Sequence, residues 1–345
     1  MSEMTSAERV MCALRREEPD RVPHFEWLID KRVREAICPG CKDHNDFAVQ
    51  MGHDAVLVGP RFGSEQVGPN LFKSEWGYVS QLGAEEHGIE VESPIQTMED
   101  FERYTPPDVH VPERYNTIAE AVRAFKGKKA IGVHLNDVFS LPRYLMGMEN
   151  LLMAVAMQPE LVKALVNLSV DINLEMAKEV AAFDVDFLWS GDDYACNYGP
   201  LISPDSFRDL LYEPLCRVVA GFKELGLPLI KHTDGNLWSI IDMIIDSGIA
   251  CLDPIDPQAG MDLTEVKAKY GHVVALKGNV DCAHTLTFGT VEEVVEATKD
   301  ALRKGMPGGG FILSSSNSIH SAVKPENYMA MMKTVEQYGR YPISA

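Results

Sequence analysis

A strand-like decapeptide, residues 227–236, carries the residue types in this chain best suited to chemistry. Its sequence is Leu-Pro-Leu-Ile-Lys-His-Thr-Asp-Gly-Asn, an apolar run typical of a buried strand that ends in polar residues. Side chains two residues apart lie on one side of a strand, so His232 and Asp234 can point into one cavity and share an ion or a proton. An ordinary strand-to-loop turn with a hydrogen-bonded histidine would also explain the decapeptide taken alone.

Polar residues also end the other apolar runs of the chain. Carboxylates crowded around one histidine repel each other unless some are protonated or a cation lies among them. One imidazole with two or three carboxylates suits zinc with an open coordination position, and it also suits iron or manganese. Many aspartates at strand ends only cap the next helix, and the Asp-Pro-x-Asp-Pro sequence at 253–257 equally fits a rigid turn. Besides His232 and Asp234, the set comprises Glu26, Asp137, Asp192, Asp193, Asp253, Asp256, Asn279 and Asn317.

The elements that would position these residues alternate between strand-like and helix-like segments. Eight such units over about 300 residues predict an α/β fold, a (β/α)8 TIM barrel, whose active site lies at the carboxyl ends of the strands. A doubly wound sheet is disfavoured, because the first strand is followed by no Gly-x-Gly-x-x-Gly and the chain has no Walker A sequence. The predicted strands lie within residues 21–27, 52–59, 129–134, 185–189, 227–236, 250–257, 273–281 and 310–317.

The pattern predicts one TIM-barrel domain over residues 1–345. Residues 1–20 form an N-terminal helical extension, in which Thr5 or Ser6 is suited to cap the helix. Residues 60–110 interrupt the alternation after the second strand, and segments 76–79 and 88–91 resemble the two strands of a hairpin joined by a polar turn. We expect this insertion to cover the barrel mouth.

Composition excludes several classes of protein. A net charge of −19 argues against a nucleic-acid partner and against an anionic membrane surface. The chain has no run of about 20 apolar residues, and residues 1–18 are too polar for a signal peptide, so we expect a cytoplasmic protein. Seven dispersed cysteines fit reduced thiols better than a disulfide framework, and Cys38-Pro39-Gly40-Cys41 fits a loop better than half a metal site.

Four motifs give the chain a resemblance to a known family. They are Asp20-Arg21-Val22-Pro23, His232-Thr233-Asp234-Gly235, Gly278-Asn279-Val280-Asp281 and Ile312-Leu313-Ser314-Ser315-Ser316-Asn317. Across nearly the whole chain the sequence resembles the uroporphyrinogen decarboxylase superfamily, and within it the corrinoid-linked methyltransferases. The decarboxylase carries an arginine-rich segment after its first strand, whereas this chain has Phe25-Glu26-Trp27-Leu28-Ile29-Asp30. Because an acidic wall is unsuited to a tetrapyrrole with many carboxylates, the resemblance disfavours decarboxylation.

The departures from the thiol-methylating zinc enzymes of this superfamily point to a particular reaction. Those enzymes have His-x-Cys at the fifth strand and a further Cys at the eighth, where this chain has Asp234 and Asn317. A carboxylate makes the metal a harder Lewis acid, less suited to activating a thiolate. The pattern resembles the component of anaerobic O-demethylase systems that moves a methyl group from an aryl methyl ether to a cob(I)alamin-type corrinoid. The corrinoid signature Asp-x-His-x-x-Gly does not occur, so a separate corrinoid protein would carry the cobalt and could recognise the acidic rim.

The resemblance implies roles for individual residues in this O-demethylase component. A methylcorrinoid-to-thiol methyltransferase, a uroporphyrinogen decarboxylase-like enzyme and a non-catalytic binding module remain alternatives. Trp27, Phe139, Trp189 and Trp238 could wall an aromatic substrate, although each could equally fill the core. In the preferred interpretation, His232, Asp234 and Glu26 hold a Zn2+ ion, with Asp193 as a further ligand candidate, Asn279 or Asn317 orients the substrate oxygen, and Tyr194 donates a proton to the leaving oxygen.

Overall fold

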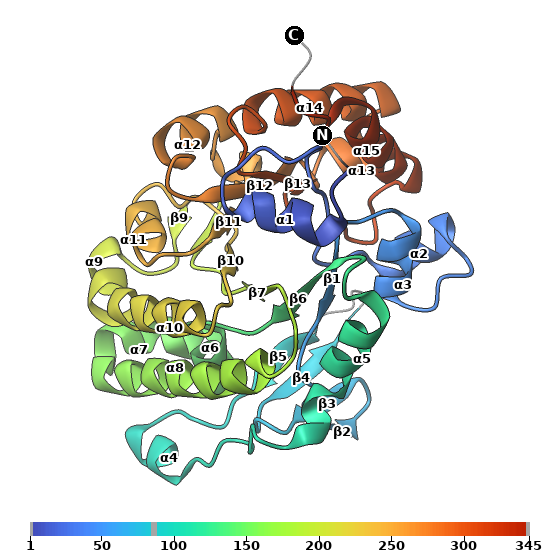
Figure 1. Cartoon of the computed structure of the whole chain (residues 1–345). Helices are drawn as coiled ribbons and strands as arrows, with labels where there is room; N and C mark the ends of the chain where they lie inside the picture. The colour runs from blue at the N-terminus through green and yellow to red at the C-terminus, as the bar shows by residue number, and fades with distance from the viewer. Residues whose placement is uncertain (1–2, 84–87, 343–345) are drawn as a thin grey trace.

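The computed structural model describes residues 3–83 and 88–342, and within them seven parallel strands form a curled central sheet (Figure 1). The sheet order is β1-β6-β7-β10-β11-β12-β13. All its neighbours are parallel, as the alternation of strands and helices predicted. The strands are β1 (Ala55–Val58), β6 (Ala130–His134), β7 (Phe187–Ser190), β10 (Leu229–His232), β11 (Cys251–Asp253), β12 (Ala275–Val280) and β13 (Phe311–Ser315).

The segment predicted as the first strand closes the barrel through single bridges. His24 forms a parallel bridge with Leu313 of β13, and the amide of Leu313 donates to the carbonyl oxygen of Pro23 at 2.9 Å. On its other side, the amide of Asp54 donates to the carbonyl oxygen of His24 at 2.9 Å, directly before β1. Residues 21–29 therefore occupy the eighth position between β13 and β1, and the TIM-barrel prediction is confirmed. Pro23 lacks an amide hydrogen, which limits regular pairing here.

Helices surround the sheet on its outer face (Figure 1). Short 3-10 helices span Pro112–Tyr115 and Pro257–Ala259, and a π-helical turn, Arg208–Tyr212, joins α9 to α10. The α-helices are α1 (Ser6–Leu14), α2 (Lys31–Ile37), α3 (His44–Gln50), α4 (Met98–Arg103), α5 (Asn116–Phe125), α6 (Ser140–Met146), α7 (Met148–Met157), α8 (Pro159–Ala181), α9 (Pro204–Phe207), α10 (Glu213–Glu224), α11 (Ile241–Asp246), α12 (Leu263–Tyr270), α13 (Thr285–Phe288), α14 (Val291–Gly305) and α15 (Pro325–Tyr338).

The N-terminal helix α1 covers one end of the barrel interior. Thr5 caps it in a capping box with Glu8, as the sequence suggested. Val10, Ala13 and Leu14 of α1 are buried in one cluster with the inward-facing side chains of the strands. These partners include small residues that begin several strands, among them Ala55 and Ala275. The helix therefore plugs the amino-terminal end of the barrel and leaves the carboxyl ends of the strands as its mouth.

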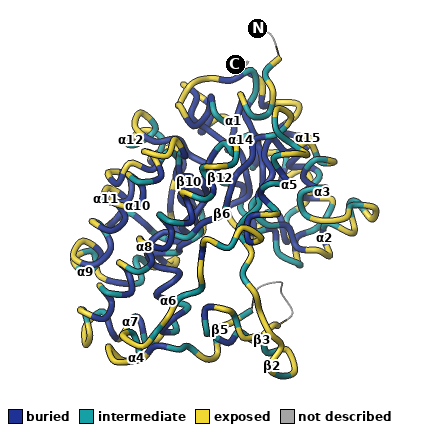
Figure 2. Tube along the Cα trace, turned by 60° about the horizontal axis from the view of Figure 1, so that its bottom comes forward, coloured by how far each residue is buried: buried dark blue, intermediate teal, exposed yellow. Residues whose placement is uncertain are grey.

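The insertion after β1 forms a separate antiparallel sheet in the order β2-β3-β4-β5. Its strands are β2 (Ser64–Gly68), β3 (Leu71–Ser74), β4 (Val79–Leu82) and β5 (Gly88–Glu92). The predicted hairpin corresponds to β4 and β5, shifted by a few residues, while its turn at 84–87 lies outside the described residues. The β2–β3 hairpin escaped prediction because β2 is almost entirely exposed and has no apolar alternation (Figure 2).

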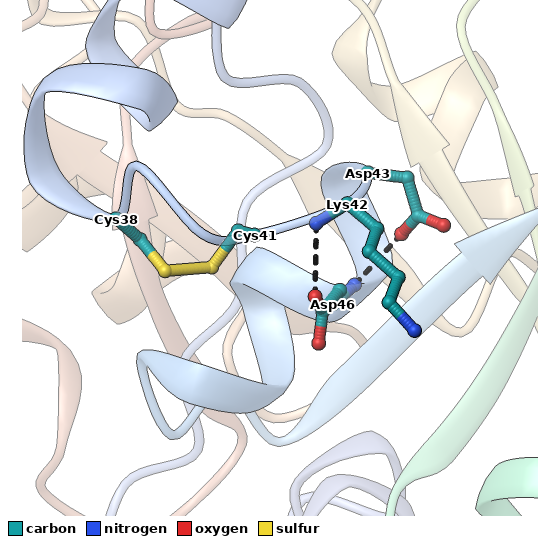
Figure 3. Close-up of a disulfide and its surroundings, with 5 residues drawn as sticks. All are labelled: Cys38, Cys41, Lys42, Asp43 and Asp46. Carbon is teal, nitrogen blue, oxygen red and sulfur yellow. Dashed lines mark hydrogen bonds between the residues drawn. A yellow bond between two sulfur atoms is a disulfide. The ribbon is translucent and has the colours of Figure 1, made fainter.

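The cysteine prediction is wrong at one place, since Cys38 and Cys41 form a disulfide (Figure 3). Helix α2 ends at Ile37 with Cys38 as its C-cap, and the following Pro-Gly turn is closed by a hydrogen bond from the amide of Cys41 to the carbonyl oxygen of Cys38. This turn brings the two Cα atoms to 5.5 Å, within the range that a disulfide requires. The other five cysteines are free thiols. No helix within the described ranges combines the length and apolar character needed to span a membrane.

Candidate active site

Three acidic and imidazole side chains meet at the barrel mouth. Asp193 follows β7, His232 is the last residue of β10, and Asp234 lies two residues farther on. One ligand atom from each lies within 4.8 Å of the others. Nε2 of His232 is 3.4 Å from Oδ1 of Asp234, and Oδ1 of Asp193 accepts a hydrogen bond from the amide of Asp234 at 3.1 Å. His232 and Asp234 therefore face one space, as their spacing predicted.

The loop after β10 holds Asp234 by a close approach of two backbones. Gly235 has φ +95°, and a Cβ atom placed there would lie 2.7 Å from the carbonyl oxygen of Cys196. The next residue, Asn236, donates its amide to that same oxygen at 2.9 Å. Only glycine combines this φ with this contact at little cost. Gly235 thus allows the loop to press against the turn after β7 and fixes the direction of Asp234.

The orientation of His232 is set by a carboxylate on the neighbouring strand. Nδ1 of His232 lies 2.9 Å from Oδ2 of Asp253, and Nζ of Lys277 lies 2.9 Å from the other oxygen of that carboxylate. The indole of Trp189 also donates to Asp253, at 3.3 Å. A carboxylate that accepts from one imidazole nitrogen directs the other nitrogen toward a ligand. Asp253 therefore turns Nε2 of His232 toward Asp234.

The electrostatics of the cluster favour positive charge. Burial alone would lower the pKa of His232, but the carboxylates of Asp234 and Asp253 outweigh burial and raise the pKa to about 10. Burial raises the pKa of Asp193, and the charge of Asp234 adds to that rise. For Asp253, burial is outweighed by Lys277 and His232, which hold its pKa well below the usual range. In the absence of a metal ion, a proton on His232 places a positive charge beside the carboxylates of Asp234 and Asp253.

The donor set fits a divalent cation. Oδ1 of Asp234 is buried and accepts no hydrogen bond from any described residue, although Oδ2 accepts one from Asn317 at 2.6 Å. A buried carboxylate oxygen without a partner is unfavourable unless a cation or a proton occupies the adjacent space. One imidazole nitrogen and two carboxylate oxygens, all within 4.8 Å of one another, are a ligand set that could coordinate zinc, iron or manganese.

The other residues predicted for the site lie outside this cluster. Glu26 accepts two hydrogen bonds from Ser315, from its amide at 2.9 Å and from its hydroxyl at 2.6 Å. Burial raises the pKa of Glu26 to about 7. Asn279 donates to the carbonyl oxygen of Ile255 at 3.1 Å. Of the predicted residues, the structure thus brings together His232, Asp234, Asp193 and Asn317.

Tyr194 belongs to a buried network beside the cluster. Its hydroxyl donates to Asp137 at 2.5 Å, and Nζ of Lys231 lies 2.7 Å from the same carboxylate. Burial, together with the charge of Asp137, raises the pKa of Tyr194 well above its usual value. Asp192 accepts hydrogen bonds from the amides of Phe139 and Ser140, at the start of α6. This arrangement supports the loops of the mouth rather than presenting a proton donor to it.

The sequence analysis missed two buried lysines, which neutralise some of the carboxylates predicted to crowd around His232. Lys231 pairs with Asp137, and Lys277 pairs with Asp253. Both lysines are buried, Lys231 on β10 and Lys277 on β12, so the protein itself supplies two of the cations that these carboxylates were expected to require. A lysine inside a short apolar run, as in Leu-Ile-Lys and Ala-Leu-Lys, was the available signal, because a buried lysine needs a partner.

Aromatic rings line the mouth next to His232. Trp27 and Trp189 stack with ring centroids 3.8 Å apart, and Trp189 lies 5.2 Å from the ring of His232. His134, at the end of β6, contacts both indoles. Two of the four aromatic residues predicted to wall the substrate are therefore at the mouth. Phe139 packs against Tyr194, and Trp238 donates to the carbonyl oxygen of Gly260 outside this group.

Comparison with known sequences places the chain among relatives with two kinds of activity. The uroporphyrinogen decarboxylase of Psychromonas ingrahamii is 22% identical over 272 residues, which cover 74% of this chain and 72% of that protein. The methylated-thiol–coenzyme M methyltransferase of Methanosarcina mazei is 25% identical over 198 residues, which cover 56% of this chain and 51% of that protein.

A solved structure and a family model agree with these relatives. The structure of a methyltransferase from Methanosarcina mazei aligns with a TM-score of 0.73 and 19% identity, over 97% of this chain and 99% of that one. The model of the uroporphyrinogen decarboxylase (URO-D) family matches residues 81–338, which include β6 to β13 and every residue of the Asp193–His232–Asp234 cluster. The chain belongs to the uroporphyrinogen decarboxylase (URO-D) family.

Proposed function

We propose that this protein is a methyltransferase that moves a methyl group from a methoxylated aromatic compound to the cob(I)alamin-type cofactor of a separate corrinoid protein. The observation that carries the proposal is the hard donor set at the mouth. Asp234 takes the place of the cysteine of thiol-methylating relatives, and its buried Oδ1 accepts no hydrogen bond from the described residues and faces Nε2 of His232 at 3.4 Å. Carboxylate donors suit a metal that polarises oxygen better than one that activates sulfur.

In this proposal His232, Asp193 and Asp234 hold a zinc ion, and Asp193 replaces Glu26 as the third ligand. Among the residues that the structure describes, Asp193 has a ligand atom within 4.8 Å of those of the other two, whereas Glu26 is engaged by Ser315. When bound, zinc supplies a Lewis acid that stabilises negative charge on the ether oxygen of the donor. Asp253 and Lys277 keep the imidazole of His232 oriented for this role.

The other residues of the mouth position the donor and limit the access of water. The stacked indoles of Trp27 and Trp189 offer an aromatic face beside His232 for the donor ring. In this proposal Asn317, whose amide donates to Asp234, also contacts the ether oxygen. The carbon–oxygen bond breaks, its electron pair remains on the phenolate oxygen, and the methyl group passes to the corrinoid. A dry mouth strengthens the electrostatic stabilisation of that phenolate.

In this proposal the corrinoid belongs to a separate protein. The chain has no Asp-x-His-x-x-Gly motif, so the cobalt would arrive on a second protein that docks at the mouth. The net charge of −19 favours a partner with a basic docking face.

A methylated thiol is the second candidate for the methyl donor. One relative is a methylated-thiol–coenzyme M methyltransferase, 25% identical over 198 residues. The Asp at position 234 favours the oxygen donor over this alternative.

The test combines metal analysis with a donor screen. We expect about one zinc ion per chain in the purified protein, and loss of zinc in His232→Ala and Asp234→Ala. Asp281→Ala is the matched control, because Asp281 also follows a barrel strand but lies outside the cluster. Methoxylated aromatics and their methylthio analogues are then supplied with a reduced corrinoid protein. Unchanged metal content in both variants overturns the metal site, and turnover of the methylthio series alone supports the second candidate.

A further inference from the structure

A cavity of about 150 Å3 lies between the inserted sheet and the barrel. The insertion contributes Phe62, Trp76 and Tyr78, and the barrel side contributes His134, Tyr144 and Asn173. Phe62 pairs with Trp76 at a centroid distance of 4.9 Å, and Tyr78 stacks on Tyr144 at 5.0 Å. Aromatic walls of this kind favour a flat ring, and a cavity near 150 Å3 has room for one benzene-sized molecule.

One buried polar atom on the wall lacks a partner. Asn173 is 1% exposed, and its Nδ2 donates to Ser169 and to the carbonyl oxygen of Asp137. Because both partners are carbonyl oxygens, which only accept, the side-chain atom that faces them must be the amide nitrogen. Its Oδ1 accepts no hydrogen bond from the described part of the chain. A buried amide oxygen without a donor is unfavourable, so the cavity suits a ligand that brings a hydroxyl or an N–H group.

A row of packed aromatic rings lies between the cavity and the metal cluster. His134 lines the cavity and contacts Trp189 at a centroid distance of 5.2 Å, and Trp189 contacts His232 at the same distance. Two successive ring contacts therefore separate the cavity wall from the imidazole at the cluster. This separation exceeds the width of one ring, so a molecule that fills the cavity and reaches His232 must be longer than a monocyclic methoxyarene.

We propose that this cavity is a binding site for the far end of an extended aromatic methyl donor, a phenol-type ring whose hydroxyl donates to Oδ1 of Asn173. The inference rests on the proposed function for the identity of the donor. The binding site itself depends on the cavity, its aromatic pairs and the unpartnered oxygen of Asn173. The donor would then carry two rings, or one ring on a side chain, with the methoxy group at the cluster and the hydroxylated ring under the insertion.

Binding of small probes tests the cavity without metal or corrinoid. Calorimetric titration of the chelator-treated full chain compares phenol with anisole, which has the same ring but no hydroxyl donor. We expect one phenol per chain, bound about fivefold more tightly than anisole, since one neutral hydrogen bond contributes about 1 kcal/mol. Asn173→Leu should remove the preference for phenol. Equal affinities for the two probes in the wild-type chain would overturn the role of Asn173.

A cavity-filling variant tests the location and keeps the test valid if Asn173→Leu fails to fold. Met176 lines the cavity and is buried, so Met176→Phe should abolish phenol binding. Met153→Phe is the matched control, because Met153 is 55% exposed on α7. Phenol binding retained in Met176→Phe would overturn the proposed site. Phenol binding that follows these expectations in a protein without demethylase activity would support the site and refute only the proposed function.

Discussion

Buried carboxylates at the two ends of the barrel differ in how fully their oxygens are hydrogen-bonded. At the amino-terminal end, Asp54 accepts hydrogen bonds from Arg9 at 2.7 Å, from both terminal nitrogens of Arg21 at 2.8 and 2.9 Å, and from the amide of His24 at 3.1 Å. Arg9 in turn holds Asp20 at 2.7 Å. At the mouth, Asp234 has a buried oxygen that accepts no hydrogen bond from the described residues.

The pKa shifts follow the same division. Burial alone would raise the pKa of Asp54, but His24, Arg21 and Arg9 together outweigh burial and lower it. At the mouth, burial and a neighbouring carboxylate raise the pKa of Asp193. The charges at the amino-terminal end are thus satisfied within the fold and stabilise it. At the mouth, the carboxylates of Asp193 and Asp234 are satisfied only when a proton or a cation joins them, which is the property expected of a site kept for chemistry.

The largest expected effect is on the amino-terminal end. Asp54→Ala should lower the free energy of unfolding by about 4 kcal/mol, because it removes the buried acceptor that Arg9 and Arg21 share. Because the folded-state pKa of Asp54 is lowered, its contribution is present above the unfolded-state value of about 3.9 and is lost as pH falls through the folded value. Urea unfolding at pH 7 measures the change.

The control for Asp54→Ala is an exposed ion pair. Glu35 lies 3.6 Å from Lys31 on α2, and Glu35→Ala should cost less than about 1 kcal/mol. Zinc content of the folded Asp54→Ala protein should match that of the wild type. A cost for Asp54→Ala no larger than that of the control would break the contrast between the two ends.

A pH-dependent gain is expected at Glu26. Its folded pKa is about 7 against a reference value of 4.5, so the folded state holds a proton that the unfolded state has already lost. Stability therefore falls as pH rises through this window, and Glu26→Gln should stabilise the fold by about 3 kcal/mol at pH 8 but under about 1 kcal/mol at pH 5. Urea unfolding at both pH values measures the difference.

Glu224→Gln, an exposed substitution near the end of α10, is the control for Glu26→Gln and should show no such pH dependence. We expect Glu26→Gln to retain zinc, because the Glu26 carboxyl group is already hydrogen-bonded to Ser315. Loss of zinc in this variant would instead support the role as a metal ligand that the sequence suggested.

Zinc itself should stabilise the mouth. At a free concentration of 100 times the dissociation constant, binding adds about 2.7 kcal/mol to the unfolding free energy. The gain should vanish in His232→Ala and persist in His284→Ala, whose histidine is 69% exposed. Because His232 without metal keeps its proton to about pH 10, zinc must displace that proton, so at one fixed zinc concentration the gain should grow from pH 6 to pH 8. Thermal unfolding with and without zinc at both pH values tests both expectations, and an equal gain in His232→Ala would contradict the site.

The barrel could be predicted from the sequence because strands and their ends are marked by patterns among residues close together in the chain. Short apolar runs followed by polar residues mark the ends of buried strands, and residues two apart, such as His232 and Asp234, keep a fixed relation in any strand. The first strand was harder to define because Pro23 restricts pairing, and the β2–β3 hairpin was missed because its exposed strands carry little apolar pattern.

The composition of the site depends on contacts across strands that no spacing encodes. Asp193 rather than Glu26 lies with His232, because the loop after β7 turns toward β10 while Ser315 of β13 engages Glu26. Asp253 fitted a turn and an active-site role equally well from sequence, and only its register beside His232 separates the two. The ligand roles of His232, Asp193 and Asp234 remain predictions for the metal analysis.

The smallest expected effect concerns a single hydrogen bond at the mouth. Asn317 donates to Oδ2 of Asp234 at 2.6 Å, which keeps Oδ1 directed into the cluster. Asn317→Ala should weaken zinc binding about fivefold, the equivalent of about 1 kcal/mol for one hydrogen bond, because the freed carboxylate must be ordered again when the ion binds. Chelator competition at pH 7.5 measures the affinity.

Asn167→Ala is the matched control for Asn317→Ala, since Asn167 is also exposed and bonds a charged side chain, Arg217, at 2.8 Å. It should leave zinc affinity unchanged. If Asn317→Ala also leaves it unchanged, the loop held by Gly235 suffices to direct Asp234, and the mouth is more rigid than its open hydrogen bonding suggests. If affinity falls as expected, the mouth differs from the amino-terminal end in a further respect: its exposed residues, and not only its buried ones, set the strength of its charge interactions.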